Sequence, residues 1–121
     1  MHEYGMCASV LDAVERRAAG RRVDGVRVRV GVLHRVVDDA FEQAFSMVAE
    51  GTVAEGAGVE IVASPVHVEC RACGRSTDID DVPVACADCG ATDLAVGGGD
   101  ELILESLRLV PAQAGQGNGR S

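Results

Sequence analysis

The sequence predicts an α/β protein in which two helices pack on a small three-stranded mixed sheet, with an inserted module that carries four cysteines. Two segments have the apolar period of amphipathic helices, and three others have the apolar patterns of strands. Four of the five cysteines lie between residues 70 and 89. With 121 residues, the chain is long enough for one compact domain with a small insert and too short for a large multidomain enzyme.

The first helix is expected over residues 4–18, where apolar side chains recur at spacings of three and four. Arg16 and Arg17 lie in its last turn, where positive charge is favourable, and Gly20 follows as a helix-ending glycine. Cys7 lies on the apolar stripe of this helix. We therefore interpret Cys7 as a buried thiol rather than a nucleophile.

The second helix is expected between Val37 and Gly51, where apolar residues return to helical spacing. Either Asp38 or Asp39 can cap its start, and Glu42 can close a capping box. These start signals and the glycine that follows give the helix defined ends.

Three strands complete the expected domain. Residues 26–30 alternate valine with arginine, so the valine face should meet the helices. Residues 59–63 and 66–68 form a second strand, interrupted at Ser64-Pro65, because proline cannot donate to a strand ladder and favours an edge or a bend. Residues 101–110 are apolar on both faces, which predicts a central position. The first two strands should be parallel and the last antiparallel.

Two Cys-x-x-Cys-Gly turns predict a zinc site. Each turn places two thiolates on one side, and the glycine that follows can take a positive φ. Four thiolates form the tetrahedral shell that Zn²⁺ favours and leave no position for a substrate, so the zinc would be structural. An iron centre or two redox-active cysteine pairs are the alternatives. The expected ligands are Cys70, Cys73, Cys86 and Cys89.

These patterns divide the chain into three parts. Residues 1–67 and 100–110 form the α/β domain, and residues 68–99 form the zinc-binding module. Residues 97–99 are three glycines without a following helix, which we interpret as a hinge between the two. Residues 111–121 contain nothing able to form a core and are expected to be a disordered tail.

The charged residues exclude several function classes. The formal net charge is −8, and all 11 basic residues are arginine. Without lysine there is no Schiff-base residue and no Walker-type phosphate loop. An acidic surface with 2 % aromatic residues disfavours nucleic acid as a partner.

The pattern of apolar residues and cysteines indicates a cytoplasmic protein. No apolar window approaches the length of a membrane helix, and the first residues lack the basic flank of a secretory signal. Clustered cysteines suit a metal site in a reducing compartment better than a disulfide framework.

The N-terminus is a second candidate metal site. The terminal amine of Met1, the amide nitrogen of His2 and its imidazole can chelate one cation in adjoining rings. This nitrogen-rich set suits Ni²⁺ or Cu²⁺ better than Zn²⁺. A histidine at the second residue is also common at frayed termini that bind nothing, so the pattern alone leaves both interpretations open.

Several motifs together resemble the HypA family of hydrogenase nickel-insertion accessory proteins. The resemblance covers residues 1–110. The motifs are Met1-His2-Glu3, the first helix, the segment from Phe41 to Gly51, the double Cys-x-x-Cys-Gly insert, and the closing Gly98-x-Asp100-Glu101-Leu102.

The resemblance implies a nickel metallochaperone rather than an enzyme. Such a protein delivers Ni²⁺ to the precursor of the nickel-iron hydrogenase large subunit, works with a GTPase, and in some organisms also serves urease. Met1, His2 and Glu3 would bind transferable nickel, and the four clustered cysteines would hold structural zinc. We expect a monomer or weak homodimer, with no membrane partner.

Two other functions remain open from the residues themselves. The first is a zinc-ribbon adaptor for protein contacts without a transferable metal, and the second is a small thiol redox protein. His34 and His67 are interpreted as surface or hydrogen-bonded histidines, although His67 lies close enough in sequence to Cys70 to support a zinc ligand. Metal content separates the three functions.

Overall fold

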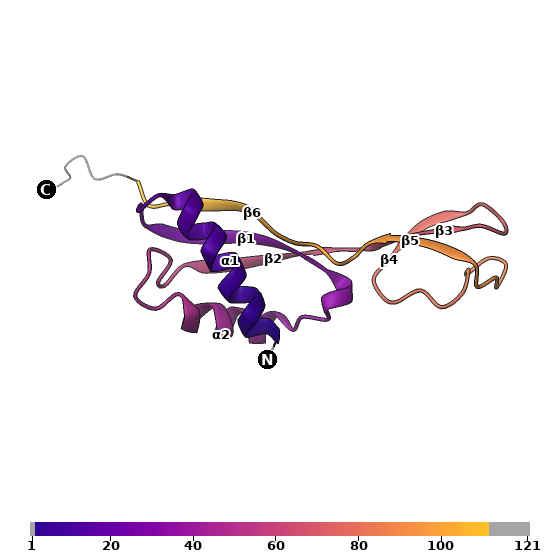
Figure 1. Cartoon of the computed structure of the whole chain (residues 1–121), viewed down its shortest axis with the longest axis horizontal. Helices are drawn as coiled ribbons and strands as arrows, with labels where there is room; N and C mark the ends of the chain where they lie inside the picture. Colours follow the sequence, from indigo (N-terminus) through magenta and orange to yellow (C-terminus); the bar gives the residue numbers. More distant parts are fainter. Residues whose placement is uncertain (1, 112–121) are drawn as a thin grey trace, which may run out of the picture.

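The computed structural model describes residues 2–111 of the chain. They form an elongated molecule with an α/β domain at one end and a smaller all-β part at the other (Figure 1). Within these residues, no helix has the length and apolar character needed to span a bilayer. In chain order the elements are α1 (His2–Ala18), β1 (Val23–Gly31), the 3₁₀ turn η1 (Val32–His34), α2 (Asp38–Val48), β2 (Gly58–Ser64), β3 (Val66–Cys70), β4 (Ser76–Ile79), β5 (Leu94–Gly98) and β6 (Leu102–Leu109).

The sheet of the α/β domain has the order β2-β1-β6. Strand β1 pairs parallel with β2 and antiparallel with β6, which confirms the predicted mixed sheet. The predicted central position of the last strand was wrong, because β6 lies at an edge. A bulge in β6 explains the misleading pattern: Val28 pairs with Leu104 but Arg27 pairs with Ser106, so one residue is skipped. Apolar residues on both sides of the bulge therefore face the same core, namely Leu102, Leu104, Leu107 and Leu109.

Both helices cover one face of this sheet and pack against each other (Figure 1). The valine side chains of β1 lie beneath them, as predicted, and are at most 4 % exposed at Val26, Val28 and Val30. The two phenylalanines of the chain, Phe41 and Phe45, are both buried on α2. Since aromatic residues are scarce, α2 supplies the largest side chains of the core.

The start of α2 differs from the expected capping box. Val37 is the N-cap residue, and no side chain bonds to the free N–H groups there. The predicted cap by Asp38 or Asp39 with Glu42 was therefore wrong. Asp38 and Asp39 instead lie in the first turn, where negative charge interacts favourably with the helix dipole.

The expected second strand is in fact two strands in two sheets. Strand β2 ends at Ser64, at the edge of the first sheet, and β3 begins at Val66 in the middle of the second. Pro65 lies at the break, in agreement with the predicted bend.

The second sheet has the order β4-β3-β5, and both of its pairings are antiparallel. We call the part from β3 to β5 the cysteine module. Strands β4 and β5 were not predicted, because they are short edge strands with little apolar pattern. The division of the chain at residues 67/68 and 99/100 stays a prediction, and residues 112–121 of the expected tail lie outside the described part of the chain.

Candidate metal centre

The two Cys-x-x-Cys turns lie at the tip of the cysteine module and have matching backbone hydrogen bonds. The Gly74 N–H donates to the Cys70 carbonyl at 2.8 Å, and the Gly90 N–H donates to the Cys86 carbonyl at 2.9 Å. Both glycines are in the left-handed region, with φ of 79° at Gly74 and 78° at Gly90. This conformation strains other residues, so the glycine after each cysteine pair is needed for the turn.

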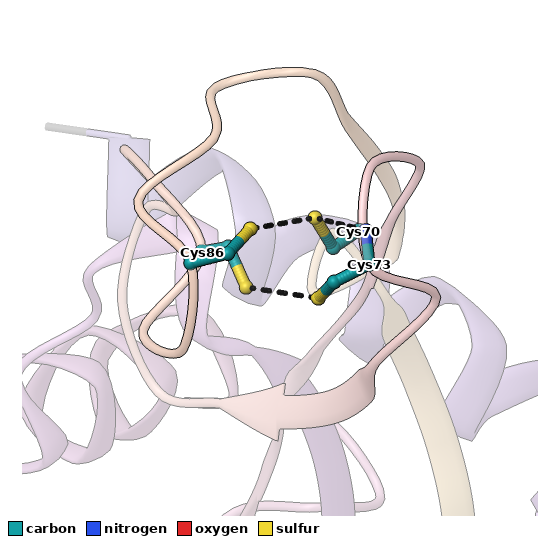
Figure 2. A group of neighbouring side chains, drawn as sticks. Cys70, Cys73 and Cys86 are labelled. Atoms are coloured by element: carbon teal, nitrogen blue, oxygen red, sulfur yellow. Dashed lines mark hydrogen bonds between the residues drawn. The ribbon is translucent and has the colours of Figure 1, made fainter.

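The turns bring the four predicted ligands together. The four Sγ atoms lie within 4.8 Å of one another. The separation is 3.6 Å between Cys70 and Cys89 and 3.7 Å between Cys73 and Cys86. Figure 2 shows Cys70 and Cys73 on one turn facing Cys86 on the other. A tetrahedral Zn²⁺ at about 2.3 Å from each sulfur needs S···S distances of about 3.8 Å, so the site fits zinc.

Backbone N–H groups favour the thiolate form of the first cysteine in each pair. The Cys73 N–H donates to Cys70 Sγ at 3.4 Å, and this bond is the main cause that lowers the pKa of Cys70. The N–H of Cys89 likewise lowers the pKa of Cys86 to about 7. Thiolates are the metal-binding form of cysteine, so the turns prepare both residues for a cation.

The second cysteine of the first pair shows why a cation is needed. The Arg75 N–H lowers the pKa of Cys73, but hydrogen bonds with the sulfurs of Cys70 and Cys86 outweigh it and raise this pKa to about 12. Four sulfurs this close therefore do not all ionise by themselves. A divalent cation supplies the charge that allows them to do so.

Exposed ion pairs surround the cysteines. Arg75 on the first turn pairs with Asp88 on the second at 2.8 Å, and Arg71 pairs with Asp93 at the same distance. Pairs as exposed as these contribute about 0–1 kcal/mol each. They assist the approach of the two turns but are too weak to hold them together.

His34 and His67 each make a hydrogen bond through a ring nitrogen. His67 Nδ1 is 2.8 Å from Asp78 Oδ1, on an exposed surface between β3 and β4. His34 Nε2 donates to the Asp100 carbonyl at 2.8 Å. Both agree with the interpretation as hydrogen-bonded surface histidines. Among the described residues, the four cysteines are the one group of three or more potential ligands close enough to hold a metal.

The expected nickel ligands are at the start of α1. Met1 lies outside the described residues, and His2 is the first residue of the helix. Glu3 follows in the first turn and is half-buried. This end of α1 lies beside α2, whereas the cysteine turns lie at the far tip of the other part (Figure 1). The two expected metal sites are thus on different parts of the molecule.

Cys7 is buried, as predicted. Its Sγ donates to the Phe41 carbonyl at 3.3 Å, and the residue has no exposed surface. Burial, with a smaller contribution from the charge of Glu3, raises the pKa of this thiol to about 11. The thiol is neutral near pH 7, which removes the basis for a redox role at Cys7.

An α/β domain that carries a four-cysteine module with zinc-compatible geometry defines a small metal-handling protein. The family model described as "Hydrogenase/urease nickel incorporation, metallochaperone, hypA" matches residues 1–109. The chain belongs to the HypA family. It is therefore a hydrogenase maturation and nickel-incorporation metallochaperone with a four-cysteine metal site, and not an enzyme.

Curated relatives agree with this assignment. The hydrogenase maturation factor HypA of Alkalilimnicola ehrlichii is 39 % identical over 112 residues, which cover 90 % of this chain and 99 % of the relative. Hydrogenase maturation factor HypA 2 of Bradyrhizobium diazoefficiens is 35 % identical, with the same coverage of both chains.

Two solved structures share the fold. The solution structure of the Ni metallochaperone HypA from Helicobacter pylori is 22 % identical, with a TM-score of 0.62 over 91 % of this chain and 98 % of that one. A second structure, titled "Solution structure of HypA protein", is 25 % identical, with a TM-score of 0.63 over 91 % of this chain and 97 % of that one. The overall fold is thus common to these proteins.

Proposed function

We propose that this protein binds Ni²⁺ at its N-terminus and delivers it to the large-subunit precursor of nickel-iron hydrogenase, and to urease where the cell makes that enzyme. The observation that carries the proposal is the family match over residues 1–109, which includes both the N-terminal Met-His-Glu and the cysteine turns. Cytoplasmic location and a monomeric or weakly dimeric state stay predictions.

The proposed nickel ligands are Met1, His2 and Glu3. The Met1 amine, the His2 amide and the His2 imidazole supply nitrogen donors, and Glu3 adds a carboxylate. His2 is the first residue of α1, and the first N–H groups of a helix have no acceptor within it. Metal binding at this amide would therefore break no helical hydrogen bond. Nitrogen donors in a planar set suit Ni²⁺.

We also propose that the cysteine site holds structural zinc. Its ligands would be Cys70, Cys73, Cys86 and Cys89, because their sulfur separations match a tetrahedral Zn²⁺. When bound, the ion compensates two of the four thiolate charges and cross-links the two turns. Four protein ligands leave no open position, so this site would not be the one that releases metal.

Nickel would leave by ligand exchange with a partner. Thiolates in a recipient are softer ligands than nitrogen and carboxylate, so they can take the ion from a partly exposed terminus.

The exposed face of α1 is the proposed contact for the GTPase, through Asp12, Glu15 and Arg16. Asp12 pairs with Arg16 at 2.5 Å. The three side chains together carry a net negative charge, which favours contact with a cationic patch on the GTPase. Charge reversal at Asp12 and Glu15 should weaken GTPase binding and reduce its salt dependence.

Nickel titration of the zinc-loaded protein tests the proposal. We compare the native chain, an N-terminally extended chain that lacks the free Met1 amine, and His2→Ala. Both changes should weaken nickel binding strongly and leave zinc in place. His67→Ala is the matched control, because it removes an exposed histidine far from α1. Equal nickel affinity in all four proteins would refute the N-terminal nickel site and leave the cysteine site unaffected.

A further inference from the structure

The α/β domain and the cysteine module meet where three stretches of chain cross. The first is the turn after β1, the second surrounds Pro65 between β2 and β3, and the third joins β5 to β6. Figure 1 shows this narrow crossing between the two parts of the molecule. We call residues 31–34, 64–66 and 98–101 the junction.

Hydrogen bonds join two of these stretches. The Gly31 N–H donates to the Glu101 carbonyl at 2.7 Å, and the Leu33 N–H donates to the Gly99 carbonyl at 2.8 Å. His34 adds the side-chain bond to Asp100 described above. The turn that leads out of the cysteine module is therefore attached at three points to the end of β1 and to η1.

The backbones at the junction are in direct contact. A Cβ placed on Gly31 would lie 2.1 Å from the carbonyl carbon and oxygen of Gly99. A Cβ on Gly99 would lie 2.5 Å from Val66 Cγ2, and φ is 83° at Gly99. Because no side chain fits between these segments, the glycines predicted as a hinge end in a packed turn at Gly99.

The carboxylate of Glu101 closes that turn. Its Oε1 accepts from the Gly99 N–H at 2.9 Å. The hydroxyl of Ser64, which is buried at the end of β2, also bonds to it, and the guanidinium of Arg29 on β1 supplies positive charge nearby. The N–H of Glu101 itself and then these groups hold the pKa of the carboxyl below its usual range. The carboxylate is thus ionised and interacts with groups from β1, β2 and the turn itself.

An exposed ion pair between the two parts contributes little. Arg35 pairs with Asp81 of the cysteine module at 3.2 Å, but both side chains are more than 60 % exposed. A pair in that position contributes about 0–1 kcal/mol. The half-buried Glu101, by contrast, contacts both the turn and the first sheet.

We propose that Glu101 is a positioning residue, whose carboxylate locks the Gly98–Glu101 turn and holds the cysteine module in one direction relative to the α/β domain, as nickel incorporation requires. A partner that touches both parts then meets a preformed surface, and binding does not have to order two loosely joined bodies. The functional half of the proposal rests on the nickel-delivery role proposed above, whereas the structural half does not.

Residual dipolar couplings of backbone N–H groups in the zinc-loaded full chain test the structural half. In the native protein and in Asp100→Asn, one alignment tensor should fit both parts. Asp100→Asn is the matched control, because it removes a neighbouring charge while the backbone carbonyl that His34 contacts remains. In Glu101→Ala, the module should need its own tensor of smaller magnitude, with zinc content and helix signals unchanged. Glu101→Gln should restore one tensor, since its amide oxygen can accept from Gly99.

A single tensor for Glu101→Ala would overturn the structural half. If that variant fails to fold, Ser64→Ala removes one donor to the carboxylate and should give a smaller but measurable separation of the two tensors. A single tensor for Ser64→Ala would then overturn the proposal in the same way.

Hydrogenase activity in cells that depend on this protein tests the functional half. Glu101→Ala should lower nickel-dependent hydrogenase activity at least several-fold, while nickel affinity of the purified protein stays at the native value. Glu101→Gln should recover the activity. Full activity for Glu101→Ala with a loosened module would overturn this half. Failure of the nickel proposal gives a different result. In that case His2→Ala would keep the native nickel affinity, and one alignment tensor would still fit both parts of the protein.

Discussion

The α/β domain and the cysteine module each contain three strands, yet they bury very different numbers of apolar residues. Fifteen residues form the buried core cluster of the domain, with both phenylalanines at its centre. In the described part of the module, the buried apolar residues are Val66, Val68 and Cys70, while Val82 and Val84 are 48 % and 79 % exposed. The domain can fold through the hydrophobic effect, whereas the module needs its metal.

Loss of the metal should therefore have the largest effect, and only on the module. Cys73→Ala should release zinc and unfold the module, because structural zinc contributes roughly 10–16 kcal/mol to such folds. Zinc content and the amide NMR spectrum measure the result, and the helix signals should persist. Cys7→Ala, which removes a thiol outside the module, should keep zinc. A Cys73→Ala protein with full zinc and an unchanged module would refute the four-thiolate assignment.

A cavity in the domain core should give the opposite pattern. Phe45→Ala should lower the free energy of unfolding of the domain by about 3–5 kcal/mol, since Phe45 is 1 % exposed. Urea denaturation followed by helical circular dichroism measures this loss, and chelator competition should show unchanged zinc affinity. Met47 on α2 is 60 % exposed, so Met47→Ala should change the free energy of unfolding by less than about 0.5 kcal/mol. Zinc loss in Phe45→Ala would show that the module depends on the domain.

The two parts should also respond to pH in opposite directions. Burial raises the pKa of Cys7 from 9.0 to about 11. The stabilising effect of the neutral thiol on the domain is therefore complete below pH 9, and about 3 kcal/mol of the free energy of unfolding is lost as pH rises through 11. The pKa of Cys86 falls from 9.0 to about 7 in the metal-free turn, so protons compete with a cation for this thiolate as pH falls through 7, and zinc affinity should fall with pH.

The melting temperature of the domain between pH 8 and 11 measures the first change, and zinc release between pH 8 and 5 measures the second. Cys7→Ala should remove most of the alkaline loss and leave the acid release of zinc unchanged. If Cys7→Ala loses the same amount of stability at high pH, another group must cause that loss.

The smallest effect is expected for the ion pair between the two cysteine turns. Arg75→Gln removes the contact with Asp88 and should lower the free energy of unfolding of the zinc-loaded module by at most about 1 kcal/mol, and less at high salt. Chelator competition at low and high salt measures it, with Arg108→Gln on the domain surface as the control. A larger, salt-independent loss would mean that the ion pair, rather than the metal, holds the turns together.

The predictability of the fold follows the same division. Both helices and β1 were predicted, because their apolar periodicity is long and faces a real core. The edge position of β6 was missed because of its bulge. One residue is skipped between its pairs with Val28 and Arg27, so the core-facing residues change from even-numbered to odd-numbered positions and the strand looks apolar on both faces. Strands β4 and β5 were missed, because they are short and form around the metal turns.

Within the sites, sequence spacing was sufficient only where the chemistry is local. Two Cys-x-x-Cys-Gly repeats specify both the turn and the position of its two sulfurs, so the close approach of the four cysteines was predicted. Glu101 gave no such signal, since its role depends on Ser64, which is distant in sequence, and on the backbone approach of Gly31 to Gly99. Sequence patterns do not reveal contacts of that kind.

The pairing of β1 with β6 has a consequence for the order of events during synthesis. Val28 pairs with Leu104, so one side of the first sheet stays open until nearly the whole chain has been made. Strands β3 to β5 pair only with one another, over a much shorter loop of chain. Shorter loops close at lower entropic cost and sooner. On the ribosome, the cysteine module can therefore take up its metal and fold while the domain that bears the N-terminus still lacks its last strand.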